Sequence, residues 1–161
     1  MTTATALDPG EEFSKARLRL WIRLYRAARF IETELRERLR REFDMTLPRF
    51  DVLAALYRQR DGMLMSELSR ALMVSNGNVT GIVDRLAGEG LIARTRRNGD
   101  RRTSIVRLTP EGFRYFRRIA AVHEGWVDEL LGVFGPREVE QLSQLLKPLK
   151  PEHETDREDQ T

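Results

Sequence analysis

The chain has 161 residues, 40% of them hydrophobic and 33% charged, which is enough apolar material for the core of one domain under a highly charged surface. It contains no cysteine and only two histidines, His123 and His153, which lie far apart in the sequence. This composition excludes disulfides, thiol redox chemistry and a Cys/His zinc site.

Two charged blocks stand out against a net charge of only +3. The segment from Arg94 to Arg107 holds six arginines against one aspartate, a local balance of +5. The residues after Pro151 carry five acidic side chains against one arginine. A basic block inside a folded region indicates a polyanionic partner, although a solvated basic loop would have the same composition.

The first predicted element is a long helix. Residues 1–12 are small, polar and acidic, and we expect a disordered arm there. Apolar residues then recur at helical spacing from Phe13 to about Phe43, which would make a helix of roughly 45 Å. One small domain cannot cover such a length, so we assign residues 13–47 to an N-terminal dimerisation helix. Its polar side is rich in arginine, namely Arg29, Arg36, Arg38, Arg40 and Arg41.

Three shorter helices follow. Pro48 predicts the start of the second helix, which the turn at Asp61-Gly62 ends. Ser66 is the predicted N-cap of a short third helix. A tight connection at Val74-Ser75 leads into a fourth helix, with Ser75 as its N-cap and the glycines at 88–90 as its C-terminal stop.

The fourth helix has an unusual outward face. Its apolar residues share one side, and Gly77 and Gly81 lie on the opposite side. Each glycine in a helix interior costs roughly 1 kcal/mol relative to alanine. A face without side chains would let the backbone approach a DNA groove, whereas tight packing or a frayed helix would account for the glycines without DNA. No Lys-Ser/Thr follows these glycines, so they do not form a P-loop.

The pattern then changes to a β-hairpin. Leu91 to Arg97 alternates like a strand, Asn98-Gly99-Asp100 predicts a tight turn, and Ser104 to Leu108 returns. Two helices joined by a tight turn and followed by a basic hairpin make a winged helix-turn-helix, which we assign to residues 48–109. Its second helix would enter the major groove of DNA, and its wing would reach the adjacent minor groove.

Two further helices complete the chain. Thr109-Pro110-Glu111 predicts the start of a fifth helix, and Gly135-Pro136 the start of a sixth. We assign residues 110–150 to C-terminal dimerisation helices and residues 151–161 to a disordered acidic tail. The predicted fold class is therefore mainly α with a small β-hairpin, with about six helices. The sequence shows no signal segment and no apolar run of the roughly 18 residues that span a membrane, so we expect a cytoplasmic protein without a membrane partner.

These elements together resemble the multiple-antibiotic-resistance regulator (MarR) family. The resemblance rests on Ser75 to Leu86, on Gly90-Leu91-Ile92 and on Asp100-Arg101-Arg102 with Leu108-Thr109-Pro110-Glu111-Gly112, and it extends over the six-helix pattern from 13 to 149. It implies a homodimer built from the first, fifth and sixth helices. It also implies a pseudo-palindromic operator, with one recognition helix on each half-site, and repression of a nearby gene until a small ligand releases the protein.

The candidate DNA-binding residues carry hydroxyl, amide or guanidinium groups or no side chain at all. They are Ser75, Asn76, Gly77, Asn78, Thr80, Gly81, Arg85, Arg96, Arg97, Arg101 and Arg102. Polar groups at a helix N-terminus suit bases and phosphates. The resemblance places Arg102 in the minor groove and Arg85 on phosphate. It also implies that Asp100 holds the wing and that Asp84 anchors Arg94, although the latter could be a surface pair worth under about 1 kcal/mol.

The candidate ligand residues are aromatic or basic. The resemblance places small ligands between the dimer-forming helices and the DNA-binding lobe, where the candidates are Trp21, Tyr25, Arg29, Arg36, Arg38, Arg40, Tyr57, His123 and Trp126. We consider two effectors, an aromatic acid or its coenzyme A thioester, whose phosphates the first-helix arginines would hold. Otherwise the same side chains would be core residues or a solvated helix face. The lack of cysteine separates the chain from family members that sense oxidants through thiols.

Other functions account for less of the sequence. A nonspecific or architectural DNA-binding protein would use the same wing but would show little sequence preference. A dimeric scaffold leaves the arginines of the wing without a role. No nucleophile–base pair, metal cluster or cofactor loop is visible, so we predict no enzyme, no catalytic residues, no metal and no cofactor. We therefore expect a sequence-specific DNA-binding regulator, a ligand-released repressor of an operon for aromatic-acid or acyl-CoA catabolism.

Overall fold

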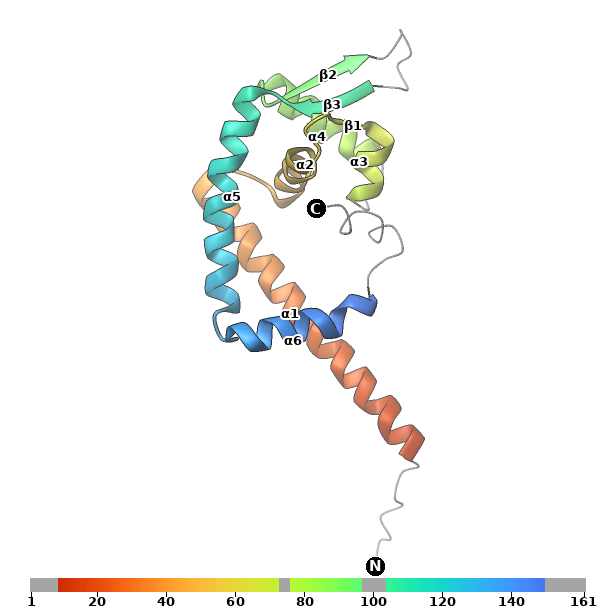
Figure 1. The fold of residues 1–161 in the computed structure, drawn as a ribbon. Helices are drawn as coiled ribbons and strands as arrows, with labels where there is room; N and C mark the ends of the chain where they lie inside the picture. The colour runs from red at the N-terminus through yellow and green to blue at the C-terminus, as the bar shows by residue number, and fades with distance from the viewer. Residues whose placement is uncertain (1–8, 73–75, 97–103, 150–161) are drawn as a thin grey trace, which may run out of the picture. The chain divides into compact units, whose positions relative to one another are not determined.

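The computed structural model describes residues 9–72, 76–96 and 104–149. Within them the chain forms six α-helices, a short 3-10 helix and one three-stranded antiparallel sheet (Figure 1). The predicted mainly helical class with six helices is confirmed. The chain forms two compact units, Met1–Trp126 and Val127–Thr161. None of the described helices is both long enough and apolar enough to cross a membrane.

Helix α1 runs from Pro9 to Phe43 and is 35 residues long. It begins four residues before the predicted start at Phe13, because proline suits the first turn and Glu11 and Glu12 follow it there, where acidic side chains favour a helix N-terminus. The predicted arm boundary at residue 12 is therefore wrong. Only the last turns of α1 are well covered, through Leu35 and Leu39.

The winged lobe contains α2 (Leu47–Arg58), α3 (Met65–Ala71) and α4 (Asn76–Gly88). Leucines and valines of these helices are almost completely buried and form one core, namely Val52, Leu53, Leu56, Leu68, Val79, Val83 and Leu86. The predicted N-cap at Ser66 is wrong, because α3 already begins at Met65. The Glu67 carboxylate accepts a hydrogen bond of 2.8 Å from the backbone N–H of Leu64 and so satisfies this end of the helix.

The sheet has the order β1-β3-β2, with β1 at Met63–Leu64, β2 at Ile92–Arg96 and β3 at Ser104–Leu108. Strands β2 and β3 form the predicted hairpin, whose tip at residues 97–103 lies outside the described residues. Strand β1 is an addition to the predicted elements. It has only two residues, and it is a strand because Met63 and Leu64 pair with Val106 and Ile105, some 40 residues away in the sequence.

Helix α5 runs from Pro110 to Leu131, and α6 from Pro136 to Leu146, followed by the 3-10 helix Lys147–Leu149. In the first unit, α5 buries Phe116, Ile119 and Trp126. In the second unit, no residue of α6 is buried. The exposed apolar positions of α6 are Val139, Leu142, Leu145 and Leu146.

Candidate nucleic-acid interface

Helix α4 has one fully buried face and, opposite it, an exposed face with two glycines. Val79, Val83 and Leu86 have no exposed surface and hold the helix against the lobe core. Gly77 and Gly81 lie on the exposed side, and a Cβ atom added to either would have no neighbour within 4 Å among the described residues. The helix continues through Gly81, so neither tight packing nor fraying accounts for that glycine. At both glycines this face of α4 is exposed and carries no side chain.

The predicted DNA-contacting residues fall into three groups. Asn78 and Arg85 are exposed on α4, and Thr80 is half-buried there. The side chains of Asn76 and Arg96 are not described. Ser75, Arg97, Arg101 and Arg102, together with the wing residue Asp100, lie outside the described residues. The described part of the interface is therefore the bare face of α4 with polar side chains beside it, which suits the major groove.

An ion pair connects the wing to α4. Arg94 on β2 donates from Nη1 to Asp84 Oδ1 at 2.5 Å, and its Nη2 lies 3.5 Å from Ser104 Oγ on β3. Arg94 is thus the link between the hairpin and the recognition helix that the sequence suggested. The Asp84 side chain is 57% exposed, so the pair is expected to contribute little to the free energy of unfolding.

Two more contacts fix the C-terminal end of α4. Arg49 on α2 donates to the Glu89 carboxylate. The Thr109 hydroxyl donates to the Gly90 carbonyl at 2.6 Å and accepts from the Gly112 N–H at 2.9 Å, so it joins the α4–β2 turn to the start of α5. Gly112 is required here, since a Cβ at that position would lie 2.0 Å from the Leu91 carbonyl oxygen.

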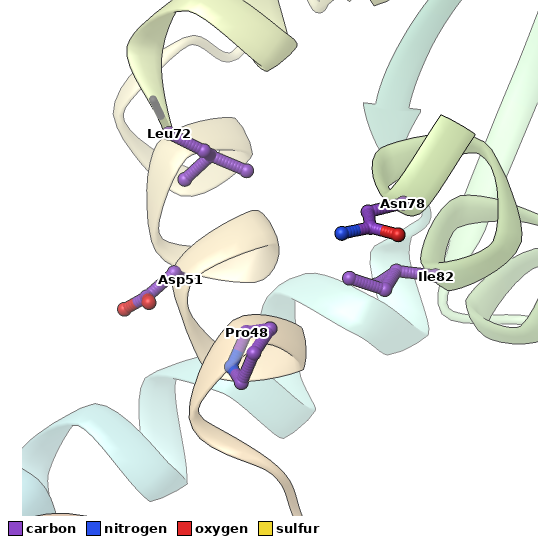
Figure 2. Close-up of a pocket in the computed structure, with 5 residues that line it drawn as sticks. All are labelled: Pro48, Asp51, Leu72, Asn78 and Ile82. Carbon is purple, nitrogen blue, oxygen red and sulfur yellow. The ribbon is translucent and has the colours of Figure 1, made fainter. Parts of the chain in front are cut away.

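A pocket of about 340 Å³ lies between α2, the end of α3 and α4. Figure 2 shows Asn78 and Ile82 extending from α4 towards Pro48 and Leu72, while the Asp51 carboxylate points away from α4. Burial raises the pKa of Asp51 above its ordinary value, as does the neighbouring Glu32 carboxylate, and Arg58 partly opposes them. The pocket is thus lined mainly by the apolar side chains of Pro48, Leu72 and Ile82. The Asn78 side chain adds an amide group from α4.

Three predicted ligand residues belong to an aromatic cluster between α2 and α5. His123 stacks on Phe50 with ring centroids 4.4 Å apart, and Tyr57 stacks on Phe113 at 4.7 Å. Trp126 is only 8% exposed. Burial lowers the pKa of His123, so its neutral form is favoured. These contacts are those of core side chains. By contrast, Trp21 and Tyr25 are exposed on α1 and stack on each other with ring centroids 6.0 Å apart.

The first-helix arginines mostly have acidic partners. Arg29 lies 3.2 Å from Glu32, Arg36 also pairs with Glu32, and Arg38 lies 4.0 Å from Glu34. Arg40 is exposed. Such i,i+3 and i,i+4 pairs are usual on a solvated helix. Because glutamates already neutralise these arginines, α1 has less positive charge available for a phosphate group than its number of arginines indicates.

Sequence reasoning missed one concentration of positive charge. Arg60 and Arg107 line a groove of about 480 Å³ with apolar neighbours from α2, the sheet and α5. The two arginines are 47 positions apart in the sequence. They line the same groove only because β3, which carries Arg107, pairs with β1, which follows Arg60. The only hint in the sequence was the outward position of Arg107 in the alternation of its strand.

Comparisons with known proteins agree on one family. A family model described as "MarR family" matches residues 45–104. The chain is 33% identical to the transcriptional activatory protein BadR of Rhodopseudomonas palustris over 142 residues, which are 86% of this chain and 79% of that protein.

Solved structures extend the likeness to the whole fold. A mutant of E. coli MarR complexed with operator DNA is 26% identical, with a TM-score of 0.69, and the match covers 90% of this chain and 100% of that one. A structure on the regulation of DNA binding of Bordetella bronchiseptica BpsR by 6-hydroxynicotinic acid is 24% identical, with a TM-score of 0.71 over 81% of this chain and 98% of that one.

Proposed function

Because this chain belongs to the MarR family of transcriptional regulators, we propose that it is a ligand-released repressor that binds a pseudo-palindromic operator as a homodimer. As a member of that family it is a DNA-binding regulator of transcription and not an enzyme. The operator, the dimer, the effector and the direction of regulation are the proposed part. We place the protein in the cytoplasm, where its DNA would be.

The observation that carries the proposal is the open face of α4. Gly77 and Gly81 present bare backbone, Asn78 is exposed beside them, and the Asp84–Arg94 pair ties the basic hairpin to the same helix. A helix without protruding side chains approaches the groove closely, and a hairpin fixed to it reaches the next groove in register. We assign groove contacts to α4 and minor-groove contact to Arg102.

Two apolar surfaces support a homodimer. The N-terminal half of α1 exposes Phe13, Leu20 and Trp21, and α6 exposes Leu142 and Leu145. Several large apolar side chains exposed on one helix are the kind of surface that a protein–protein interface covers. A two-fold dimer would present two copies of α4 to half-sites one helical turn apart, about 34–36 Å, which requires a pseudo-palindromic operator.

The proposed effector is an aromatic acid or its coenzyme A thioester, and the controlled genes would then belong to a catabolic operon for that compound. 6-Hydroxynicotinic acid, the regulator of BpsR, is an acid of this class, but the likeness to BpsR supports the fold alone. BadR is named an activator, so the sign of regulation needs its own test. The ion pairs of Arg29, Arg36 and Arg38 favour the free acid over a thioester held by α1.

The experiment is fluorescence anisotropy on labelled DNA from upstream of the gene for this protein, at one fixed salt concentration. A regulator should bind this DNA at least about 10³-fold more tightly than a scrambled duplex. Equal affinity for both duplexes would instead establish a nonspecific or architectural DNA-binding protein. Adding free aromatic acids and their thioesters to the complex then tests release, and a reporter gene in cells gives the sign of regulation.

A further inference from the structure

Two arginines of the winged lobe, Arg60 and Arg107, line one groove without an ion-pair partner among the described residues. Arg49 pairs with Glu89, and Arg94 pairs with Asp84. Arg60 and Arg107 form no ion pair within the described part of the chain, and neither does Asp61 or Glu111, the acidic residues next to their groove in sequence. Both arginines are exposed, and they line one groove together with their guanidinium groups free of ion pairs within the described part of the chain.

Apart from the two arginines and Thr109, the residues that line this groove are apolar. Its lining comes from the end of α2, the outer face of β2 and β3 and the start of α5, namely Leu56, Ala93, Leu108, Thr109, Pro110 and Phe113, besides the two arginines. The Arg60 guanidinium carbon lies 5.0 Å from the centre of the Phe113 ring. The backbone register places Arg107 opposite Ala93, whose small side chain leaves room beside it.

This combination selects a particular chemistry. Arginine binds a carboxylate through paired N–H groups, and apolar and aromatic walls accept a flat ring. With a volume of about 480 Å³, the groove is within the range of sites for small organic ligands. We propose that the groove binds the free carboxylate form of a small aromatic acid, with Arg60 and Arg107 on the carboxylate and the ring against Phe113, Leu108 and Pro110.

Occupancy of the groove would act on the wing. Arg107 lies on β3, which pairs with both β1 and β2, whereas Arg60 follows the end of α2. A carboxylate held by both arginines would join α2 to the arm of the hairpin and restrict the angle of the wing to the lobe. This inference rests on the ligand response proposed above, and it locates that response in the lobe rather than on α1. A thioester has lost the charged carboxylate, so it should bind this groove more weakly.

The test uses the full-length protein and three variants, Arg60→Gln, Arg107→Gln and the control Arg114→Gln. Arg114 is exposed on α5 and is not among the residues that line the groove. Binding of benzoate and 4-hydroxybenzoate is measured by titration calorimetry, and operator affinity is measured without any acid. We expect each groove variant to lose at least about tenfold in acid affinity, while the control binds like the wild type. All variants should keep the wild-type unfolding midpoint and operator affinity.

Three results would overturn the inference. If the groove variants bind the acids like the wild type, the site lies elsewhere and the ligand response stands. If they lose operator affinity in the absence of acid, the two arginines contact DNA phosphates. If the wild type binds its operator but neither acid, the groove has no such ligand, and the DNA-binding function stands without it. Ala93→Phe, which fills the groove, should repeat the loss of acid binding without removing a charge.

Discussion

In the winged lobe Leu53, Leu68 and Leu86 are fully buried, whereas on α1 Trp21 is 61% exposed and on α6 Leu145 is 73% exposed. Both regions carry apolar stripes at helical spacing. In the lobe, α2, α3, α4 and the sheet pack around one core. Their apolar stripes therefore bury one another within the first unit. The terminal helices have stripes that their own units leave open. The core of the lobe is therefore covered within the first unit, whereas the exposed stripes of the terminal helices are the surfaces that the proposed homodimer would cover.

The comparison predicts that the bare face of α4 can be changed without harm to the lobe. Gly81→Leu should reduce operator affinity by at least about 100-fold, because a bulky side chain keeps the helix from the groove and each lost base contact costs roughly 1–3 kcal/mol. The free energy of unfolding should stay equal or rise by up to about 1 kcal/mol, since leucine favours a helix more than glycine does. Anisotropy and chemical denaturation measure the two effects.

Gly88→Leu is the matched control. Gly88 also has open space around it but lies at the far end of α4, so operator affinity should change little. If Gly81→Leu bound the operator as tightly as the wild type does, the bare face of α4 would not be needed for close approach to the DNA groove.

A second prediction concerns the open surfaces. Leu145→Glu should weaken dimerisation by roughly 100-fold or more, because a charge would be buried without a partner at the interface. Sedimentation equilibrium measures the dimer, and operator affinity should fall with it. Val133→Glu is the control, since Val133 is 80% exposed but lies between α5 and α6. A Leu145→Glu protein that remains a dimer would exclude this face of α6 from the interface.

A third prediction concerns His123, where α5 meets α2. Its pKa is lowered by burial, so the unfolded chain binds a proton more readily than the folded one. The stability from neutral His123 is complete above the ordinary pKa of 6.5 and is lost as the pH falls from 6.5 through the lower folded value. The denaturation midpoint should therefore drop from pH 7.5 to pH 5.5. In His123→Phe this drop should shrink. An equal drop in that variant would assign the pH dependence to other groups.

The smallest predicted effect lies inside the lobe. A double-mutant cycle on Asp84→Ala and Arg94→Ala should give a coupling energy below about 1 kcal/mol for unfolding, because the pair is largely exposed. The same cycle measured on operator binding should give a larger coupling, since the pair orients the wing. Equal couplings would mean that the pair acts on the fold and has no separate effect on the wing.

Local patterns predicted most of the elements. Pro48, Pro110 and Pro136 lie at or next to the starts of α2, α5 and α6, as expected from the preference of proline for the first turn. The errors at Ser66 and Phe13 concern helix ends, where Glu67 and the first-turn acids decide the boundary. Strand β1 could not be predicted, because two residues have no periodicity of their own and depend on β3 for their hydrogen bonds.

By itself, the sequence determined the six helices, the hairpin and the glycine face of α4, because helix and strand periodicity, capping and the cost of glycine are properties of neighbouring residues. It also carried the family resemblance. The ion pairs of the first-helix arginines also follow from the sequence, because their glutamate partners lie three or four residues away on the same helix. Only the tertiary structure decided which distant side chains meet: Arg49 pairs with Glu89, whereas Arg60 and Arg107 line one groove and have no ion-pair partner among the described residues. The sequence specifies the charges, but whether a charge is compensated depends on which side chains the fold brings within a few ångströms of it.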